Sequence, residues 1–518
     1  EKSALLYNLQ AQDKKIKLEV VIYNKFLKED LNKDNFKFNI KGKENGRNCI
    51  LPIGKCRLED RLLYLEIEID FNLSEIIGQI TQDKYECDII YINGRKETSY
   101  CVIGQWNMDT ITITHNMHRY SIGAADADRK FCVWTSLIWK RFENTKQKRR
   151  IIVKYIYPLL RLLPIRKKRI IFEGWWGKKY HCNPRYLYEY INRNYPEYEC
   201  IWSMNDESYL INGTGKTVRR NSLKYHFYMA TAKYFVNNVN FMDSYEKRKG
   251  QIEIQTMHGT PLKTLGLDVP GEITTEEQRV KFLRRCNRWD YLIVQSKEAE
   301  RITSSCFAYK KEFLRTGYPR NDILFKMNTE DGINAVKNEL GIPENKKVIL
   351  YAPTWRRRNK FDLMLDLEDM KSRLGKDYVL LLRIHPYALA GFDDSIVDDF
   401  VYNVSSYPSI EKLYVISDLM ITDYSSAMFD YAILNRSILF FTYDLESYRD
   451  NLRGFNIDLE TEAPGPLYAT SEEVVHAIEN IEKVAKEYDI ALQRFRNKYC
   501  EYERGRACEE IIHEVFCK

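Results

Sequence analysis

One histidine, His258, follows an apolar run at a position where a strand is expected to end. A neutral imidazole can accept a proton near pH 7, so a histidine placed there could act as a general base. A lone histidine is more often structural. Here a glycine turn and a hydroxyl donor favour an oxygen-rich ligand. The adjoining candidates in "HGTPLK" are Gly259, Thr260, Pro261 and Lys263.

A second histidine, His385, lies between Arg383 and Pro386 after the apolar run "YVLLL". An arginine at a strand end is costly to bury unless an anion accompanies it. In open α/β sheets, ligands bind beyond the carboxyl ends of the strands. We therefore expect both imidazoles to line one cleft, and a structural role for each is the alternative.

Three further strand ends carry hydroxyl, basic or acidic side chains. "TDYSSAMFDY" places two serines at the start of a helix, where they cap the helix or help to bind phosphate. "YAPTWRRR" and "GYPRND" supply basic groups that either clamp phosphate or remain solvated. The candidates are Ser425, Ser426, Asp430, Pro353, Thr354, Arg356 and Arg320.

The sequence contains neither the HExxH motif of zinc enzymes nor the P-loop of nucleotide-binding proteins. We predict no metal site and no cofactor, so His, Arg, Lys and helix dipoles must neutralise any developing negative charge. The twelve cysteines are scattered without a CxxC pair, which is typical of free thiols in a reducing compartment.

The elements that must position these residues change in type along the chain. Residues 1–135 alternate apolar and polar side chains between turn signals, as in "KIKLEVVIY" and "LLYLEIEIDF", and predict an all-β, sandwich-like accessory domain. From residue 169 onward, short apolar runs alternate with helical patterns, which predicts parallel sheets with crossover helices. Two such sets indicate Rossmann-like domains at 169–335 and, with C-terminal helices, at 336–518.

Between these regions, residues 136–168 form a basic amphipathic connector. From Lys140 to Arg169 there are twelve basic residues and one acid, although the net charge of the whole chain is only +7. Such a segment is typical of a helix that lies on an anionic membrane surface. A nucleic-acid patch and a solvated helix without a partner are the alternatives. The apolar stretch at 151–165 is too interrupted to span a membrane.

Four motifs in this order resemble the CDP-glycerol glycerophosphotransferase family of teichoic-acid-type polymerases and primases. They are "HGTPLK", "YAPTW", "RIHP" and "ITDYSSAMFDY", and "FEGWWGKKYHCNPRYLYEY" at 172–190 is similar to the family's first domain. The resemblance covers about residues 165–465. It implies an α/β fold with a GT-B-like pair of Rossmann-like domains. The all-β domain comes before this pair, at the N-terminus.

The resemblance also implies an activity. A CDP-polyol would donate its polyol phosphate to the terminal hydroxyl of a lipid-linked polyol-phosphate or glycan acceptor and release CMP. His258 would be the general base, and His385 would stabilise the leaving CMP. The other matched positions would bind the donor. The enzyme is then expected at the cytoplasmic face of the membrane as a peripheral protein that binds no nucleic acid, with homo-oligomerisation left open.

Several functions remain open from the sequence. Glycerol is the favoured polyol, and CDP-ribitol is the alternative within the same class. A nucleotide-sugar glycosyltransferase of GT-B type is a second class of enzyme. A basic scaffold that binds polymer without catalysis is a third reading, and it requires both histidines to be dispensable. The chain begins at Glu1 rather than Met, so one open reading is that it is a piece of a longer protein.

Overall fold

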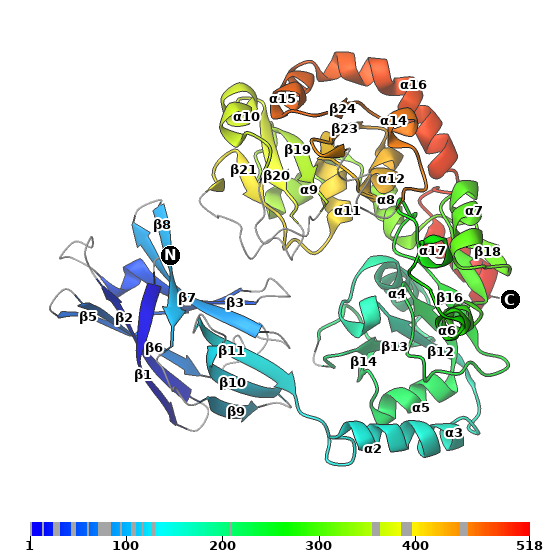
Figure 1. Cartoon of the computed structure of the whole chain (residues 1–518), viewed down its shortest axis with the longest axis horizontal. Helices are drawn as coiled ribbons and strands as arrows, with labels where there is room; N and C mark the ends of the chain where they lie inside the picture. Colours follow the sequence, from blue (N-terminus) through cyan, green and yellow to red (C-terminus); the bar gives the residue numbers. More distant parts are fainter. Residues whose placement is uncertain are drawn as a thin grey trace. The chain divides into compact units, whose positions relative to one another are not determined.

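A computed structural model of the chain divides into two compact units, residues 1–148 and 149–518 (Figure 1). The description covers residues 3–517 except 13–14, 24–31, 43–47, 60–61, 71–83, 94–95, 105–109, 116–117, 126–129, 208, 355–362, 385–395 and 446–453. Two predicted site residues, Arg356 and His385, therefore lie outside the described residues.

In its described residues the first unit contains eleven strands in one hydrogen-bonded sheet. Along β6 the side chains alternate, and Leu63, Leu65 and Ile67 are fully buried while their neighbours are not. This period of two follows from the pleat of a strand and confirms the predicted strand-rich N-terminal region. The strands are β1 (Ser3–Gln12), β2 (Lys15–Tyr23), β3 (Phe36–Gly42), β4 (Asn48–Pro52), β5 (Lys55–Glu59), β6 (Leu62–Asp70), β7 (Lys84–Asn93), β8 (Lys96–Ile103), β9 (Ile111–His115), β10 (His118–Ala125) and β11 (Lys130–Leu137), with the short η1 (Lys33–Asn35) before β3.

The second unit contains two parallel sheets. In the first sheet, neighbouring residues Ile170 and Ile171 of β12 belong to the cores on opposite faces, so the strand is buried on both sides, as parallel sheets require. The strand order is β14-β13-β12-β15-β16-β17-β18. Their bounds are β12 (Arg166–Glu173), β13 (Glu199–Met204), β14 (Lys216–Arg219), β15 (Ala232–Asn237), β16 (Ile252–Gln255), β17 (Tyr291–Ile293) and β18 (Glu312–Leu314).

The second sheet repeats this design in the order β21-β20-β19-β22-β23-β24. Its central strand β19 sends Val348 and Leu350 into one core and Ile349 into the other. The bounds are β19 (Lys347–Ala352), β20 (Tyr378–Leu382), β21 (Val401–Asn403), β22 (Leu419–Thr422), β23 (Ser437–Phe441) and β24 (Leu467–Tyr468). Two parallel sheets with crossover helices confirm the predicted mixed α/β class.

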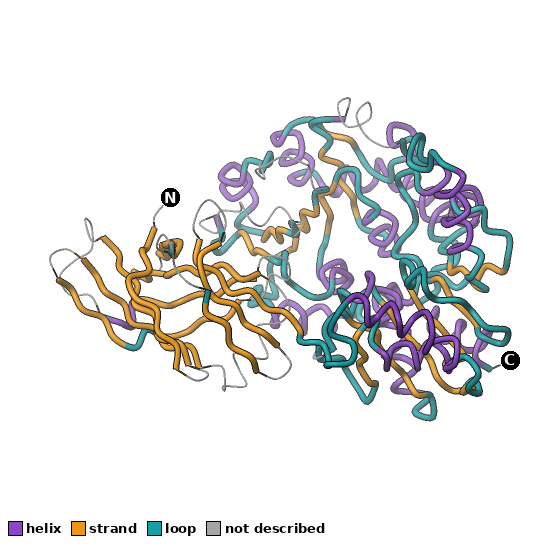
Figure 2. Tube along the Cα trace, turned by 60° about the horizontal axis from the view of Figure 1, so that its bottom comes forward, coloured by secondary structure: helices purple, strands orange, loops and turns teal. Residues whose placement is uncertain are grey.

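Helices connect and cover the strands of both sheets, and Figure 2 shows them as purple segments around the orange strands. Around the first sheet they are α4 (Cys182–Asn194), α5 (Leu223–Thr231), α6 (Glu276–Cys286) and α7 (Lys297–Cys306), with the short turns η3 (Trp175–Gly177), η4 (Gly266–Asp268) and η5 (Pro319–Asn321). Around the second sheet they are α8 (Asp322–Lys326), α9 (Glu330–Glu339), α10 (Leu367–Leu374), α11 (Ile410–Ile416), α12 (Ala427–Tyr431), η8 (Ala432–Leu434) and α14 (Leu459–Glu462).

The C-terminal helices are α15 (Ser471–Glu479), α16 (Ile481–Tyr499), α17 (Ala507–Ile511) and η9 (Ile512–Phe516). Helix α15 begins with a capping box: the Thr470 side chain accepts a hydrogen bond from the Glu473 backbone, and the Glu473 side chain caps the Thr470 backbone. The end of the chain differs from the predicted division at residue 336. Phe516 packs on Tyr234 of β15 with ring centroids 4.3 Å apart, because apolar residues of α17 and η9 complete the core of the first sheet.

The basic segment forms a short helical stretch, α2 (Lys146–Ile151), η2 (Ile152–Ile156) and α3 (Tyr157–Leu160). Not all of the charge counted from Lys140 to Arg169 is available at the surface, because Arg166 to Arg169 belong to β12. Arg169 is 4% exposed, and its guanidinium donates to the Glu199 carboxylate at 2.7 Å and to Thr231 at 2.5 Å. Among the helices of the described residues, none is both long and apolar enough to cross a membrane.

Candidate active site

His258 lies beyond the carboxyl end of β16, next to the end of β15. Its ring Nδ1 is 3.0 Å from the backbone oxygen of Asn238. A carbonyl oxygen only accepts hydrogen bonds, so this contact requires that Nδ1 carries the proton. The neutral ring therefore has its lone pair on Nε2, which is the nitrogen free to accept a proton.

The surroundings of His258 keep its imidazole neutral. Although the residue retains an exposed surface, the protein atoms around it desolvate the ring, and this lowers the pKa of His258 below its ordinary value of 6.5. The positive charge of Arg320 also lowers this pKa, while the bond to Asn238 opposes the shift. The Trp175 ring packs against the imidazole with centroids 4.7 Å apart. At neutral pH the ring can thus act as a base.

Gly259 is required by two features of the turn. Its φ is 137°, a conformation that residues with a Cβ rarely adopt. A Cβ at this position would also lie 3.0 Å from Nη2 of Arg320. Nη1 of the same guanidinium donates to the His258 backbone oxygen at 2.5 Å and to Cys182 Sγ at 3.2 Å. The small residue after the histidine therefore makes room for an arginine.

Arg320 and Asp430 form a buried ion pair that joins the two sheets. Nη2 of Arg320, which follows β18, donates to Oδ2 of Asp430 on α12, and the two side chains are 10% and 6% exposed. Asn321 donates to the other carboxylate oxygen at 3.0 Å. Burial disfavours the charged guanidinium, but the carboxylate prevails and holds the pKa of Arg320 well above its ordinary value. Both groups are thus engaged with each other.

The residues after Gly259 also connect the sheets. The Thr260 hydroxyl donates to Oε1 of Gln295 at 2.8 Å. The carbonyl oxygens of Pro261 and Lys263 accept from Nδ2 of Asn456 at 2.9 and 3.1 Å. Lys263 further forms an isolated β-bridge with Phe455. The "HGTPLK" turn is therefore held on one side by the first sheet and on the other by a loop of the second.

In the second sheet, two adjacent strand ends are joined by a threonine. Thr354 follows β19, and its backbone N–H and hydroxyl donate to Oδ1 of Asp423, after β22, at 2.8 and 2.6 Å. Pro353 beside it is half-buried. Ser425 is half-buried and Ser426 is exposed directly before α12. The Ser425 hydroxyl accepts from the Ala427 backbone at 3.3 Å, as a local cap does.

Arg383 is held by backbone carbonyls rather than by a carboxylate. Its Nη1 lies 2.6 Å from the Val404 oxygen, 2.8 Å from that of Ser405 and 2.6 Å from that of Tyr407. Burial lowers the pKa of this guanidinium. The structure thus groups His258, Gly259, Arg320 and Asp430 by direct contacts, whereas Thr354 and Arg383 each contact other partners.

Several residues that support this site are not among the sequence predictions. Asn183 on α4 donates to the backbone oxygens of Thr256 and Met257 at 2.9 and 3.0 Å and accepts from the Arg320 backbone at 3.2 Å. Trp175 contacts the His258 ring, and its backbone N–H donates to the Asn238 side chain at 3.0 Å. Trp175 and Asn183 both occur in the stretch at 172–190. The similarity of this stretch to the family's first domain is the feature of the sequence that could have identified them.

Two parallel sheets with polar residues at their carboxyl ends define an α/β protein, and loops of both sheets contribute to the candidate site. The chain belongs to the CDP-glycerol:poly(glycerophosphate) glycerophosphotransferase family, because the model of this family matches residues 155–517. The family that the four motifs indicated is thus confirmed.

Relatives and solved structures agree with this assignment. The teichoic acid poly(glycerol phosphate) polymerase of Bacillus subtilis (strain 168) is 41% identical over 73% of this chain, which spans 53% of that relative. The polymerase of the same description from Bacillus spizizenii is 40% identical over 70% of this chain and 96% of its own length. A structure of the wall teichoic acid polymerase TagF superposes with a TM-score of 0.65 at 36% identity, covering 70% of this chain and 94% of TagF.

Proposed function

We propose that the protein transfers glycerol phosphate from CDP-glycerol to the terminal hydroxyl of a lipid-linked or polymeric acceptor and releases CMP, in the synthesis of a teichoic-acid-like or capsular polymer. The observation that carries this proposal is the family match, because residues 155–517 include every candidate site residue. The relatives named as poly(glycerol phosphate) polymerases favour glycerol over ribitol.

His258 is the general base of the proposed reaction. Its Nε2 removes the proton from the acceptor hydroxyl, and the oxygen attacks the phosphorus that carries glycerol. The bond from this phosphorus to the bridging oxygen breaks, and CMP leaves with the electron pair. Desolvation and the bond to the Asn238 backbone leave His258 neutral and correctly protonated for this step.

Residues of the second sheet are proposed to bind the donor. Ser426 is exposed beside the half-buried Ser425, and Thr354 stands at the neighbouring strand end. Arg356 and His385, which would stabilise the pyrophosphate and the leaving CMP, lie outside the described residues. For Arg320 and Asp430 we propose a different role, since their mutual ion pair holds the donor side and the His258 turn together.

The function is tested with purified protein, a lipid-linked primer, and either CDP-glycerol or CDP-ribitol. We expect CMP release with CDP-glycerol and much slower release with CDP-ribitol. Faster release with CDP-ribitol would assign the ribitol activity instead. Sugar transfer from a UDP-sugar without CMP release from either CDP-polyol would place the protein among the glycosyltransferases and refute the proposal.

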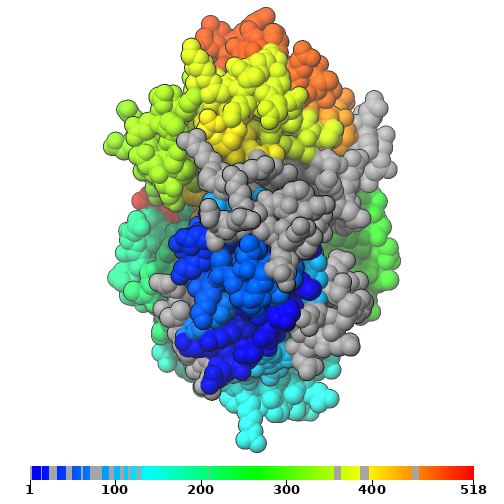
Figure 3. All heavy atoms as spheres, turned by 90° about the vertical axis from the view of Figure 1, so that its left-hand side faces the viewer, coloured from blue at the N-terminus to red at the C-terminus, as the bar shows by residue number. Residues whose placement is uncertain are grey.

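A peripheral position at the cytoplasmic face of the membrane is part of the same proposal. The helical stretch from α2 to α3 exposes Ile151, Tyr155, Leu159 and, after its end, Leu162. A spacing of four residues brings Ile151, Tyr155 and Leu159 to one face of the helical stretch, beside the basic residues of the segment, and Leu162 lies in the turn that follows. In Figure 3 the cyan atoms of this region lie at the surface. Such a stripe with flanking cations fits an anionic bilayer surface.

Replacing Leu159 and Leu162 together by Ser is expected to reduce binding to vesicles that contain anionic lipid. The two side chains are 65% and 81% exposed, so the change removes apolar contact with lipid and leaves the core intact. We expect about a thirtyfold weaker partition, since each of the two leucines lost from the interface costs about 1 kcal/mol, or about 2 kcal/mol together. Co-sedimentation with vesicles measures the effect, and CMP release with a soluble acceptor should remain.

The matched control is Ile490→Ser, because Ile490 is 71% exposed on α16, outside the basic segment. This variant should bind vesicles as the unchanged protein does. If the double Leu159 and Leu162 variant sediments as the control does, the membrane role of this segment is wrong.

A further inference from the structure

The loop at residues 174–181, after β12, has an unusual backbone. Trp175, Trp176 and Gly177 follow one another with φ values of 50°, 57° and 76°. Left-handed conformations are unfavourable for bulky side chains and persist only where the surrounding structure enforces them. Two consecutive tryptophans in this conformation therefore mark the loop as a place where strain is retained.

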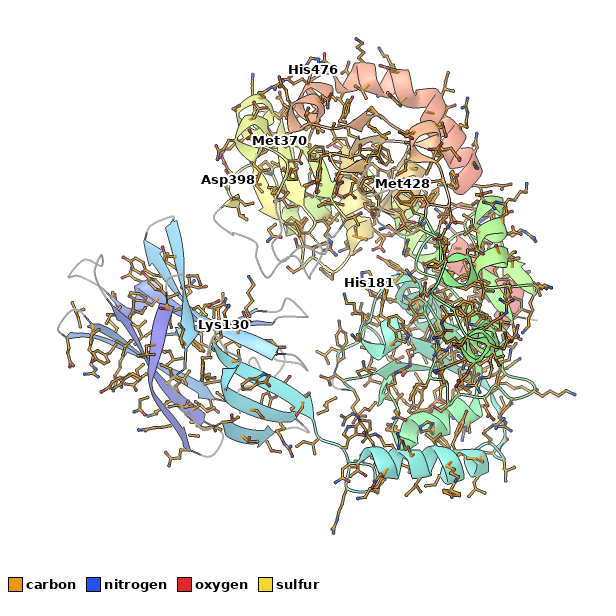
Figure 4. All side chains as sticks on the ribbon, viewed as in Figure 1. Lys130, His181, Met370, Asp398, Met428 and His476 are labelled. Carbon is orange, nitrogen blue, oxygen red and sulfur yellow. The ribbon has the colours of Figure 1, made fainter. Side chains whose placement is uncertain are left out.

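Contacts with the rest of the fold hold the loop rigid. The Gly177 backbone N–H donates to the Gly174 oxygen at 3.0 Å, and the Gly177 oxygen accepts from the Asn205 backbone at 2.7 Å. A Cβ at Gly174 would lie 2.6 Å from the Lys179 backbone oxygen, so the loop closes tightly on itself. It ends at His181, labelled in Figure 4 at the start of α4. The side chains on this loop are thus presented in a defined arrangement.

The loop directly adjoins the proposed base. The Trp175 ring packs on the His258 ring, and the Trp175 backbone N–H donates to the side chain of Asn238. The backbone oxygen of the same asparagine accepts from His258 Nδ1. One residue, Asn238, therefore anchors both the base and the loop, and the loop begins in direct contact with the proposed base.

The loop exposes one aromatic ring and two cations. Trp176 is 48% exposed, and Lys178 and Lys179 are also exposed. Within the described part of the chain, neither ammonium group has an acidic partner or another hydrogen-bond acceptor. Lys179 is nevertheless crowded: desolvation, followed by the positive charges of Arg383 and Lys178, lowers its pKa. Cations gathered in this way without a carboxylate suit a bound anion.

We propose that Trp176, Lys178 and Lys179 form the binding site for the acceptor, and that the ligand is a polyol-phosphate segment. The indole would pack against the C–H groups of a polyol, and the two ammonium groups would contact phosphodiester oxygens. This inference rests on the proposed function and specifies the substrate class at the His258 side of the site. An exposed tryptophan with lysines also suits a membrane surface, but the neighbouring Trp175 of the same loop packs on the proposed base, which favours the acceptor.

Binding of the acceptor can be measured without catalysis. The probe is a lipid-free poly(glycerol phosphate) oligomer, titrated by calorimetry into the full chain without donor. We expect Trp176→Ala to raise the Kd of the oligomer about tenfold, which corresponds to one aromatic contact of about 1.4 kcal/mol. Trp176→Phe should restore most of the affinity. Replacing Lys178 and Lys179 together by Gln should also raise the Kd and weaken its dependence on salt.

Two controls separate this site from other causes. Replacing Lys483 and Lys486 by Gln removes two exposed cations from α16 and should leave the Kd of the oligomer unchanged. The Kd of CDP-glycerol should also be unchanged in all variants, whereas KM for the acceptor rises in the CMP-release assay.

The assignment is wrong if the unchanged protein does not bind the oligomer, or if neither the Trp176 nor the lysine variant changes its Kd. An equal loss of CDP-glycerol affinity would indicate that the loop binds donor phosphates instead. A loss restricted to binding of anionic vesicles would indicate a membrane contact. Oligomer binding that depends on Trp176 without CMP release from any CDP-polyol would refute the proposed function and leave the binding site standing.

Discussion

Substituting His258 by Ala is expected to lower CMP release from CDP-glycerol by about 10²–10⁴-fold, the range typical for loss of a general acid or base. The affinity for CDP-glycerol should remain, because His258 acts on the acceptor hydroxyl. The residue retains an exposed surface, and within the described part of the chain its ring makes one hydrogen bond, to the Asn238 backbone, so the variant should fold. Donor binding by calorimetry and CMP release by chromatography measure the two effects separately.

The pH dependence provides an independent test of the same role. The base must be neutral to act, so kcat/KM falls as the pH decreases through the pKa of His258. Because desolvation lowers this pKa, we expect the acidic limb of the profile to lie below pH 6.5. The residual activity of His258→Ala should lack this limb. If the limb persists with the same midpoint in the variant, another group is the base.

The matched control is His476→Ala. His476 is labelled in Figure 4 on α15, and its side chain is 74% exposed. This variant should retain both the rate and the pH profile of the unchanged protein. An equal loss of activity in both variants would show that the effect is not specific to His258.

Replacing Arg320 by Met is expected to destabilise the unit at 149–518 by about 3–5 kcal/mol, because it leaves the Asp430 carboxylate buried without its cation. The guanidinium also donates to the His258 backbone oxygen and to Cys182, and these acceptors lose their donor. The denaturant midpoint should fall, and CMP release should fall with it, since the His258 turn loses its support. Unfolding monitored by circular dichroism measures the first effect.

An exposed ion pair serves as the control for Arg320→Met, and a double variant tests whether Arg320 and Asp430 are coupled. Arg301→Ala removes an ion pair with Glu298 whose arginine is 65% exposed, and it should cost less than about 1 kcal/mol. The double variant Arg320→Met/Asp430→Asn leaves no carboxylate buried without its cation. It should therefore lose much less stability than the sum of the losses of the two single variants. Strictly additive losses would mean that the two groups are not coupled.

The strands and caps follow from local patterns, and most could be predicted. The apolar runs after residue 168, such as "VILYAP" and "SILFFTYD", correspond to β19 and β23, because strands buried on both faces are continuous apolar runs. No apolar run predicts β14, β21 or β24, which contain four, three and two residues and at most two apolar side chains each. The three-residue strands β17 and β18, by contrast, lie in the predicted runs "YLIVQS" and "EFLRTGY".

The residue types at the strand ends were also visible in the sequence. His258 after "QIEIQTM", with Gly259 beside it, predicts a tight turn that approaches an oxygen-rich ligand, and in the structure the group beside Gly259 is the guanidinium of Arg320. No local pattern could identify it, since the two positions are far apart in the chain. The pairing depends on which strands become neighbours in the sheet.

The sequence by itself determined the alternation of strands and helices, the positions of the polar strand ends and the family, because each depends on residues close together in the chain or on motifs in order. Only the tertiary structure decided the partners: that Asp430 binds Arg320, that Arg383 binds carbonyls, and that Trp175 packs on His258. Charge and ring contacts act over a few ångströms in space, and the folded arrangement alone determines which groups come that close.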